Sequence, residues 1–235
     1  MGAEAWEVGH VTWPDAEPAV MSPATEESYR ILRSRLDLSR LPKFSRDVVE
    51  RVIHATADFD YFTDLACEED WLAQGVTALA AGAPVVADTA MVAAGLTGTP
   101  VVCKINEPLT QRLARTAMIT RPAAAVRLAF GEVGPGAVWV VSGGAGALAE
   151  ILSRRVEPGF VIGFPVGFVG AAEVKDALRA SRLPSVSNTS EKGGPAVAVA
   201  VFSALLRHAL AVSGSRAGWG AEAPAGLADD DGADS

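Results

Sequence analysis

Short hydrophobic runs alternate with longer stretches of helical periodicity from about residue 45 to residue 210. The short runs are rich in valine and bounded by glycine, proline or polar residues, which is typical of buried β-strands. Strands that alternate with helices pair in parallel through right-handed crossovers. The pattern therefore predicts an α/β fold, a three-layer α/β/α sandwich around a mainly parallel sheet. The expected strands are residues 84–87, 101–104, 137–142, 160–163 and 185–187.

Helices are expected before, between and after these strands. Thr25 can cap a helix that has two glutamates in its first turn and runs to about residue 40. Ser45 can cap a second helix that ends near His54. The remaining helical patterns lie at residues 68–82, 108–129, 145–155, 170–180 and 195–210.

Both ends of the chain differ in composition from the central domain, residues 24–212. Residues 1–23 contain three prolines and are expected to form an extended N-terminal arm. Residues 213–235 are mostly glycine, alanine, serine and aspartate. A segment with so little to bury is expected to be a disordered acidic tail.

Composition favours a cytoplasmic protein with one sizeable core. Hydrophobic residues make up 49% of the chain and charged residues 20%. The longest apolar stretch, residues 195–206, is shorter than the roughly 18 residues that a membrane span needs. The first ten residues lack the basic and then apolar order of a signal peptide. Cys67 and Cys103 are isolated in the sequence, which is typical of reduced thiols.

The charge pattern argues against nucleic acid as a partner. The net charge is −8, and no basic stripe interrupts the acidic excess. Binding to nucleic acid depends on neutralising phosphates with lysine and arginine. An anionic small molecule would therefore need a few converging donors rather than a broad positive field.

Four of the loops that follow predicted strands carry polar or glycine-rich sequences, and functional loops of parallel sheets lie at these carboxyl ends. They are residues 86–92, 140–146, 163–170 and 191–195. In the last loop, Lys192, Gly193 and Gly194 precede Pro195, and proline is favoured at the first position of a helix. Free amides beside a lysine can hold an anion, so these three residues are candidates for substrate binding.

Nucleotide and metal sites are disfavoured. The turn at residues 142–146 lacks the GxGxxG spacing of a dinucleotide loop, and no Walker lysine follows any glycine-rich loop. The three histidines, His10, His54 and His208, are not spaced as a set of metal ligands. No metal and no cofactor are expected.

His54 is the candidate for proton transfer. Helical periodicity places it opposite the apolar face of its helix, so one reading is an ordinary exposed histidine. The other reading is that this face lines a cleft, completed in one version by a second subunit, where imidazole exchanges protons near neutral pH. Asp58, Asp60 and Glu50 are candidates to hold its tautomer, and periodicity does not choose among them.

Six segments, collinear over about residues 25 to 210, resemble the precorrin-8X methylmutases, also called cobalt-precorrin-8 methylmutases. They are residues 27–31 (ESYRI), 52–58 (VIHATAD), 82–92 (GAPVVADTAMV), 120–125 (TRPAAA), 163–173 (GFPVGFVGAAE) and 192–194 (KGG). Any one of these segments is weak evidence, whereas six in order are specific.

The resemblance implies a flavodoxin-like fold, a homodimer and an intramolecular methyl transfer. In this family a methyl group moves from C-11 to C-12 of precorrin-8X or its cobalt form, which gives hydrogenobyrinate or cobyrinate in cobalamin biosynthesis. The family histidine corresponds to His54 and is implied as the proton donor. Ser28 and Arg121 are implied substrate contacts, because a guanidinium grips a carboxylate well.

The chain also departs from the family pattern. Gly143 and Gly146 stand where family members usually have asparagine and threonine, and Pro122 and Pro195 stand where serines are common. These changes leave His54 and Arg121 untouched. They permit an alternative function, a corrinoid-binding or carrier protein without catalysis.

Overall fold

The computed structural model describes residues 22–154 and 156–219 of the chain. Residues 1–21 of the expected N-terminal arm and most of the expected acidic tail lie outside these residues, whereas the last two residues of the arm begin the first helix. The last helix, α10 (Pro195–Trp219), continues past residue 212, where the central domain was predicted to end.

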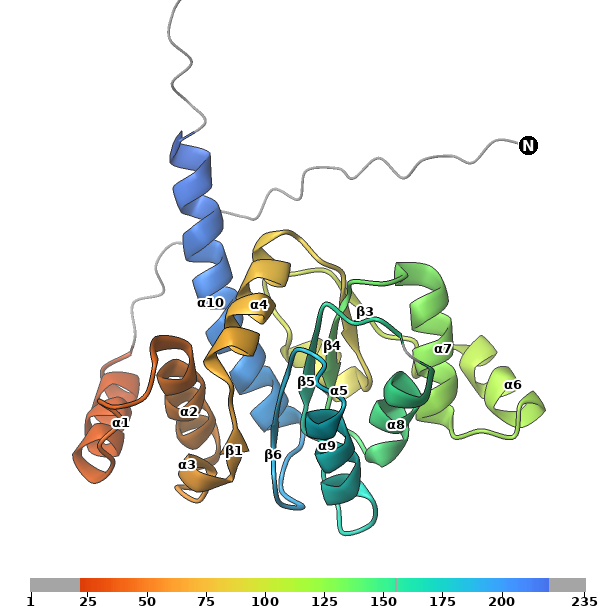
Figure 1. Cartoon of the computed structure of the whole chain (residues 1–235), viewed down its shortest axis with the longest axis horizontal. Coiled ribbons are helices and arrows are strands. Elements are labelled where there is room, and N and C mark those ends of the chain that lie inside the picture. Colours follow the sequence, from red (N-terminus) through yellow and green to blue (C-terminus); the bar gives the residue numbers. More distant parts are fainter. Residues whose placement is uncertain (1–21, 155, 220–235) are drawn as a thin grey trace, which may run out of the picture.

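Six strands form one sheet in the order β1-β6-β5-β4-β2-β3 (Figure 1). All five predicted strands are present, although three of them are shorter than predicted. The parallel strands alone, counted from β2, have the order 2-1-3-4-5, which is the flavodoxin-like order. The predicted fold class is thus confirmed. Periodicity missed only the short β1, which pairs antiparallel with β6. The bounds are β1 (Leu65–Ala66), β2 (Val85–Ala87), β3 (Val101–Val102), β4 (Val138–Val141), β5 (Phe160–Gly163) and β6 (Ser185–Asn188).

The remaining described helices are α1 (Pro23–Arg35), α2 (Lys43–Thr56), α3 (Tyr61–Asp64), α4 (Glu69–Ala80), α5 (Ala90–Gly95), α6 (Pro108–Thr116), α7 (Arg121–Val133), α8 (Ala145–Arg154) and α9 (Ala171–Ala180). The short helices α3 and α5 were not predicted. The other helices match the predicted pattern, apart from the ends of α1, the start of α2, the predicted helix 108–129 and the end of α10.

The first three of these differences have local causes. Ser22 caps α1 in place of Thr25, whose amide donates to the Ser22 hydroxyl, and the helix ends at Arg35 because the next residue is extended. Helix α2 begins before Ser45, whose amide and hydroxyl donate to Glu69. The predicted helix 108–129 is two helices, because the Thr120 side chain caps α7 and begins it anew.

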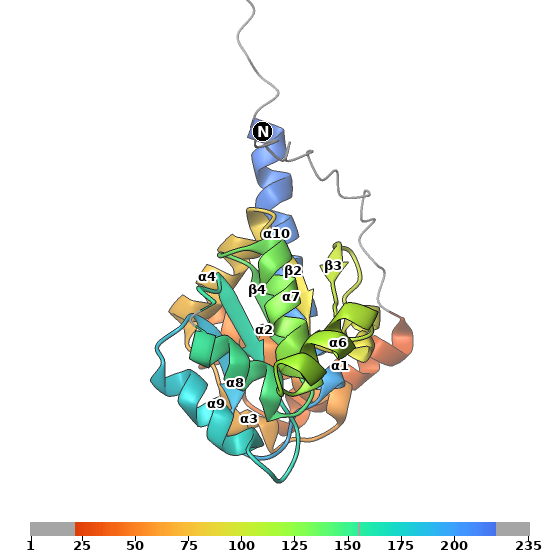
Figure 2. The same cartoon turned by 90° about the vertical axis from the view of Figure 1, so that its right-hand side faces the viewer.

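Successive strand residues point to opposite sides of the sheet and enter two separate cores. Val138 and Val140 belong to a core covered by α2, α4, α5 and α10, whereas Trp139 and Val141 belong to a core covered by α7, α8 and α9. Figures 1 and 2 show these two helical layers on either side of the sheet. The predicted three-layer arrangement is therefore present.

Helix α10 is longer and more apolar than predicted. Its segment Pro195–Gly214 is long and apolar enough to cross a membrane by length and composition, so the expectation that no stretch reaches this length was wrong. Half of that segment is buried, and α10 packs against α2, α4 and α5. This is the packing of a core helix, although its C-terminal part projects beyond the sheet (Figures 1 and 2).

Replacing Gly159 by alanine should destabilise the fold. A Cβ atom at this position would lie 2.4 Å from the Gly136 carbonyl oxygen, so the backbone would have to shift. We expect a loss of about 1–3 kcal/mol in the free energy of unfolding, measured by urea denaturation. Gly131→Ala in α7 is the matched control, because nothing lies within 4 Å of its added Cβ and alanine favours a helix. Equal stability of the two variants would contradict this account.

Candidate active site

The four loops predicted to be functional meet at the carboxyl edge of the sheet. The Val166 amide donates to the Gly143 carbonyl at 3.2 Å, and the Gly167 amide donates to the Glu191 carbonyl at 3.1 Å. Asp88, directly after β2, accepts the amides of Ser142 and Gly143 at 3.0 and 2.7 Å. The strand order reverses between β2 and β4, and ligands of open α/β sheets bind at such a point.

The close packing at this point explains the two glycines that depart from the family pattern. A Cβ at Gly143 would lie 3.0 Å from the Asp88 carboxylate and 3.2 Å from Thr89. A Cβ at Gly146 would lie 2.9 Å from the Thr120 hydroxyl. Burial raises the pKa of Asp88 to about 6, against the opposing effect of the amides that it accepts. The turn after β4 therefore closes directly onto Asp88.

His54 lies in the last turn of α2 with its side chain exposed, as its helical position predicted. Its Nδ1 atom is 2.9 Å from the Ser28 hydroxyl on α1. The structure thus brings together two of the predicted site residues, 26 positions apart in sequence. Among the described residues, Nε2 of this exposed side chain makes no hydrogen bond.

Tyr29 and Arg33 fix the plane of the His54 ring. The Tyr29 ring stacks on the imidazole with 4.6 Å between ring centroids and an interplanar angle of 11°. The Arg33 guanidinium lies 5.6 Å from the centroid of the Tyr29 ring. Glu50 engages both Nε and Nη2 of Arg33 at 2.8 Å. Glu50 therefore acts on His54 only through this stack, and Ser28 takes the position that was predicted for a carboxylate.

Lys192 forms ion pairs with the other two carboxylates that were candidates to orient His54. Its ammonium lies 2.7 Å from Asp58 and 2.8 Å from Asp60. These two ion pairs raise the pKa of Lys192, so it is firmly charged and already neutralised. The Lys192 ammonium thus ties the loop after β6 to the segment that follows α2.

Gly193 and Gly194 shape this loop through their backbone. Their φ angles are +150° and +105°, and a Cβ at Gly193 would lie 2.4 Å from the Phe164 carbonyl oxygen. The Gly194 amide, predicted as a free donor for an anion, instead donates to the Phe164 carbonyl at 2.9 Å. Gly193 is therefore required for the close backbone approach, and Gly194 for its positive φ angle.

Asp64 organises the start of the same loop, and no sequence motif marked it. Its carboxylate accepts the amides of Thr189 and Ser190 at 3.0 and 2.8 Å, both of their hydroxyls, and the Asn188 side chain at 2.8 Å. Burial opposes ionisation of Asp64, but these hydrogen bonds outweigh it and lower its pKa from 3.8 to about 2. The loop wraps around a buried negative charge.

Arg121 stands apart from Ser28 and His54. Its Nε donates to the Ile105 carbonyl and its Nη2 to Asn106, both at 2.7 Å, which ties the start of α7 to the loop after β3. In Figure 1, α6 and α7 lie at the opposite end of the molecule from α1 and α2. Within one chain, the predicted carboxylate anchor does not face the predicted proton donor.

Apolar side chains are exposed along the carboxyl edge. Phe168 and Val169 are 94% and 90% exposed, and Met91 and Val166 are also exposed. Val166, Phe168 and Val169 belong to the loop after β5, and Met91 lies in the first turn of α5, which follows β2. They offer an apolar surface beside the polar groups, which suits a ligand with a flat ring.

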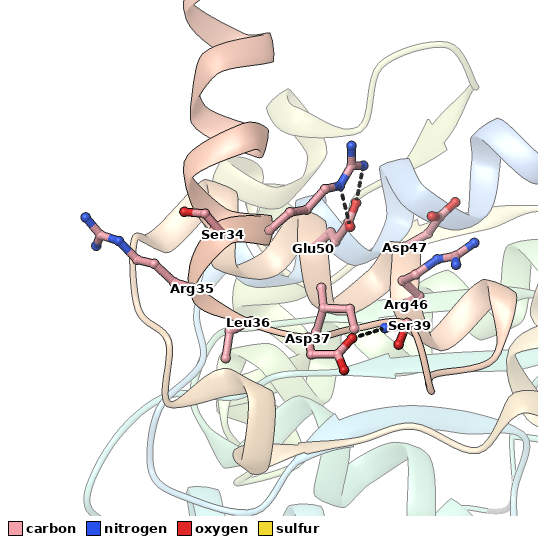
Figure 3. Close-up of a pocket in the computed structure, with 10 residues that line it drawn as sticks. Ser34, Arg35, Leu36, Asp37, Ser39, Arg46, Asp47 and Glu50 are labelled. Atoms are coloured by element: carbon pink, nitrogen blue, oxygen red, sulfur yellow. Dashed lines mark hydrogen bonds and ion pairs between the residues drawn. The ribbon is translucent and has the colours of Figure 1, made fainter.

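A cavity of about 630 Å³ lies between α1 and α2, away from these loops (Figure 3). Of the described residues that line it, Glu50 was a candidate to orient His54, and none was a predicted catalytic or substrate-binding residue. Its acidic groups are engaged within the chain, since Glu50 pairs with Arg33 and Asp37 accepts an amide. Its one link to the site is Arg33, which stacks on Tyr29.

No group of three or more histidine, cysteine, aspartate or glutamate side chains within the described part of the chain could hold a metal ion. The two cysteines are free, and burial raises the pKa of Cys67 to about 12. The chemistry offered at the carboxyl edge is therefore that of an imidazole, hydroxyls and a guanidinium.

The family can be decided on sequence comparison. A family model described as precorrin-8X methylmutase matches residues 24–208. The chain belongs to this family. It is accordingly an isomerase enzyme, a methylmutase of cobalamin biosynthesis, as the six collinear segments indicated.

Relatives and solved structures agree. The chain is 36% identical over 166 residues to the cobalt-precorrin-8 methylmutase of Methanocaldococcus jannaschii, covering 69% of this chain and 79% of the relative. It is 39% identical over 168 residues to that of Salmonella typhimurium, covering 68% and 80%. A crystal structure of precorrin-8X methylmutase from Thermus thermophilus matches with a TM-score of 0.73 and 32% identity, covering 81% of this chain and 97% of that one.

Acid should lower the free energy of unfolding of the methylmutase by protonating Asp64. Because its pKa is lower in the folded state, the stabilisation is complete above about pH 4 and is lost as the pH falls through about 2. A depression from 3.8 to about 2 corresponds to about 2 kcal/mol of unfolding free energy. We expect Asp64→Asn to be less stable at pH 6 and to lose this part of the acid slope, measured by urea denaturation from pH 6 to pH 2. Asp176→Asn, at an exposed aspartate, should keep the slope.

Proposed function

We propose that this methylmutase moves the methyl group from C-11 to C-12 of precorrin-8X, or of its cobalt form, with His54 as the proton donor. The observation that carries the proposal is the Ser28–His54 pair, an exposed imidazole held at Nδ1 with Nε2 free. The reaction is an isomerisation, so it needs neither an external methyl donor nor a nucleophile. The protein has to supply a positioned proton and a surface that holds the ring.

The hydrogen bond at Nδ1 decides which nitrogen exchanges the proton. In the charged imidazole, Nδ1–H donates to the Ser28 hydroxyl oxygen at 2.9 Å and Nε2–H is available to the macrocycle. When Nε2 has given its proton, Nδ1–H still donates to Ser28, and the neutral ring is ready to take the proton back. Stacking on Tyr29 keeps Nε2 pointing in one direction through both steps.

The substrate matches the surface along the carboxyl edge of the sheet. A corrin precursor combines a flat apolar ring with several peripheral carboxylates. Phe168, Val169 and Met91 expose apolar surface for the ring. Arg121 keeps Nη1 without a hydrogen bond among the described residues, so it can donate to a carboxylate.

A homodimer would bring Arg121 to His54. The two residues lie in opposite helical layers of one chain, since α2 belongs to one core and α7 to the other. We therefore infer that each site combines Ser28 and His54 of one subunit with Arg121 of a second subunit. The exposed apolar groups on the loops after β2 and β5 would then be covered by the ligand and the second copy.

His54→Ala should abolish turnover while leaving ligand binding in place. Conversion of precorrin-8X changes its absorbance spectrum, and we expect kcat to fall about 10²–10⁴-fold because general-acid catalysis contributes that much. Ser28→Ala should lower kcat by about tenfold, since one orienting hydrogen bond is lost. Lys43→Ala is a suitable control on the exposed start of α2.

The same measurement separates the second candidate function, a corrinoid carrier. The turn that carries Gly143 and Gly146 favours this alternative, because it removes two side chains from the carboxyl edge. A carrier would bind hydrogenobyrinate tightly and show no conversion of precorrin-8X, in wild type as in His54→Ala. Turnover by the wild-type protein excludes it.

Mixing two inactive variants tests the shared site. His54→Ala and Arg121→Ala homodimers should each be impaired, while heterodimers formed by mixing them should regain one intact site of two. We expect the heterodimer to recover about half of the wild-type activity. If both residues act within one chain, every site in the heterodimer carries a defect and no activity returns.

A further inference from the structure

The loop after β6 surrounds the ammonium group of a buried lysine from another element. Lys175 is on α9, and its side chain is fully buried. Its ammonium donates to the Asn188 side-chain oxygen at 2.8 Å, to the Ser190 carbonyl at 2.5 Å and to the Lys192 carbonyl at 2.7 Å. Three donors therefore meet three acceptors, and all three acceptors belong to residues 188–192.

Asn188 joins this cation to a buried anion. Its side-chain nitrogen donates to Asp64 at 2.8 Å, while its side-chain oxygen accepts from Lys175 at 2.8 Å. Asp64 in turn accepts the backbone amides of Thr189 and Ser190. The loop is thus folded between two opposite charges, one holding its amides and the other holding its carbonyls.

The position of Lys175 excludes it as a direct contact of the substrate. Burial lowers its pKa to about 8, so it is still mostly charged at neutral pH. The charged groups that face it are Asp64 on α3, Arg179 on its own helix and Glu191 in the loop. No ligand at the surface can reach its ammonium without displacing the loop.

The loop connects this hub with both parts of the proposed site. On one side, the Lys192 ammonium holds Asp58 and Asp60, which follow the helix that carries His54. On the other side, the Gly194 amide and the Glu191 carbonyl hold residues 164–167, which lead into the exposed apolar residues. A change at the hub therefore reaches the segment after α2 and the apolar surface together, whereas the hydrogen bond that orients His54 comes from Ser28 on α1.

We propose that Lys175 is a positioning residue of the methylmutase, whose ammonium holds residues 188–194 in the shape that binds the corrinoid. This role rests on the proposed function of the site. It differs from the role of His54, because Lys175 acts on binding and not on proton transfer. Asp64 is its counterpart from the opposite side of the loop.

Lys175→Met tests the proposal, because methionine keeps an apolar stem and removes the three donors. In the full-length protein, we expect peptides covering residues 188–194 to exchange amide hydrogen at least about tenfold faster. The KM for precorrin-8X and the Kd for hydrogenobyrinate should both rise about tenfold or more, with kcat within about threefold of wild type. Asp64→Asn should give the same pattern from the other side.

Two matched variants complete the design. Arg154→Met removes a charged side chain from α8, whose partner is Glu150, and should change neither exchange in the loop nor KM. His54→Ala should show the reverse split, a lost kcat with an unchanged Kd for the product.

Three results would overturn the role of Lys175: unchanged exchange at residues 188–194, faster exchange with an unchanged KM, or a lost kcat with KM intact. A wild-type protein that neither binds nor converts corrinoids would instead refute the proposed function. The exchange rates would then still show whether Lys175 holds the loop, so the two failures are distinguishable.

Discussion

Burial of the central strands on both faces is the constraint on which the rest of the molecule depends. Every residue of β4 and β5 is buried, so helices must cover the sheet on both sides. Alternate side chains enter two separate cores made of buried apolar residues. Polar chemistry is therefore confined to the carboxyl edge, where strands end and the backbone turns.

At this edge most charged side chains are engaged in hydrogen bonds or ion pairs within the chain. Asp64 and Lys175 fold one loop, Asp88 holds the turn after β4, and Lys192 is neutralised by two carboxylates. An unpaired charge in such a partly buried place would be costly, and each of these groups takes part in hydrogen bonds, although Oδ1 of Asp88 has no partner among the described residues. The groups left for a ligand are few, chiefly Nε2 of His54. This arrangement fits the proposed reaction, in which His54 supplies one positioned proton.

The sequence predicted the architecture well and the site only in part. Five strands, the sandwich and the exposure of His54 follow from hydrophobic periodicity, which is a local property. The cap at Ser22 and the break at Thr120 were missed, because several residues could have capped each helix. Asp64 and Lys175 were missed as a pair, since they meet at Asn188, which is 13 positions from Lys175 but 124 from Asp64 in sequence.

By itself the sequence determined the fold class, the family and the candidates for chemistry. Tertiary structure decided which partner each candidate has. Ser28, and not a carboxylate, holds His54, because α1 packs beside α2. The predicted donors Lys192 and Gly194 are used within the chain, because the crossover loops approach within hydrogen-bonding distance. Periodicity reports which side of an element faces the core, whereas hydrogen bonds between loops depend on distances that only the folded chain sets.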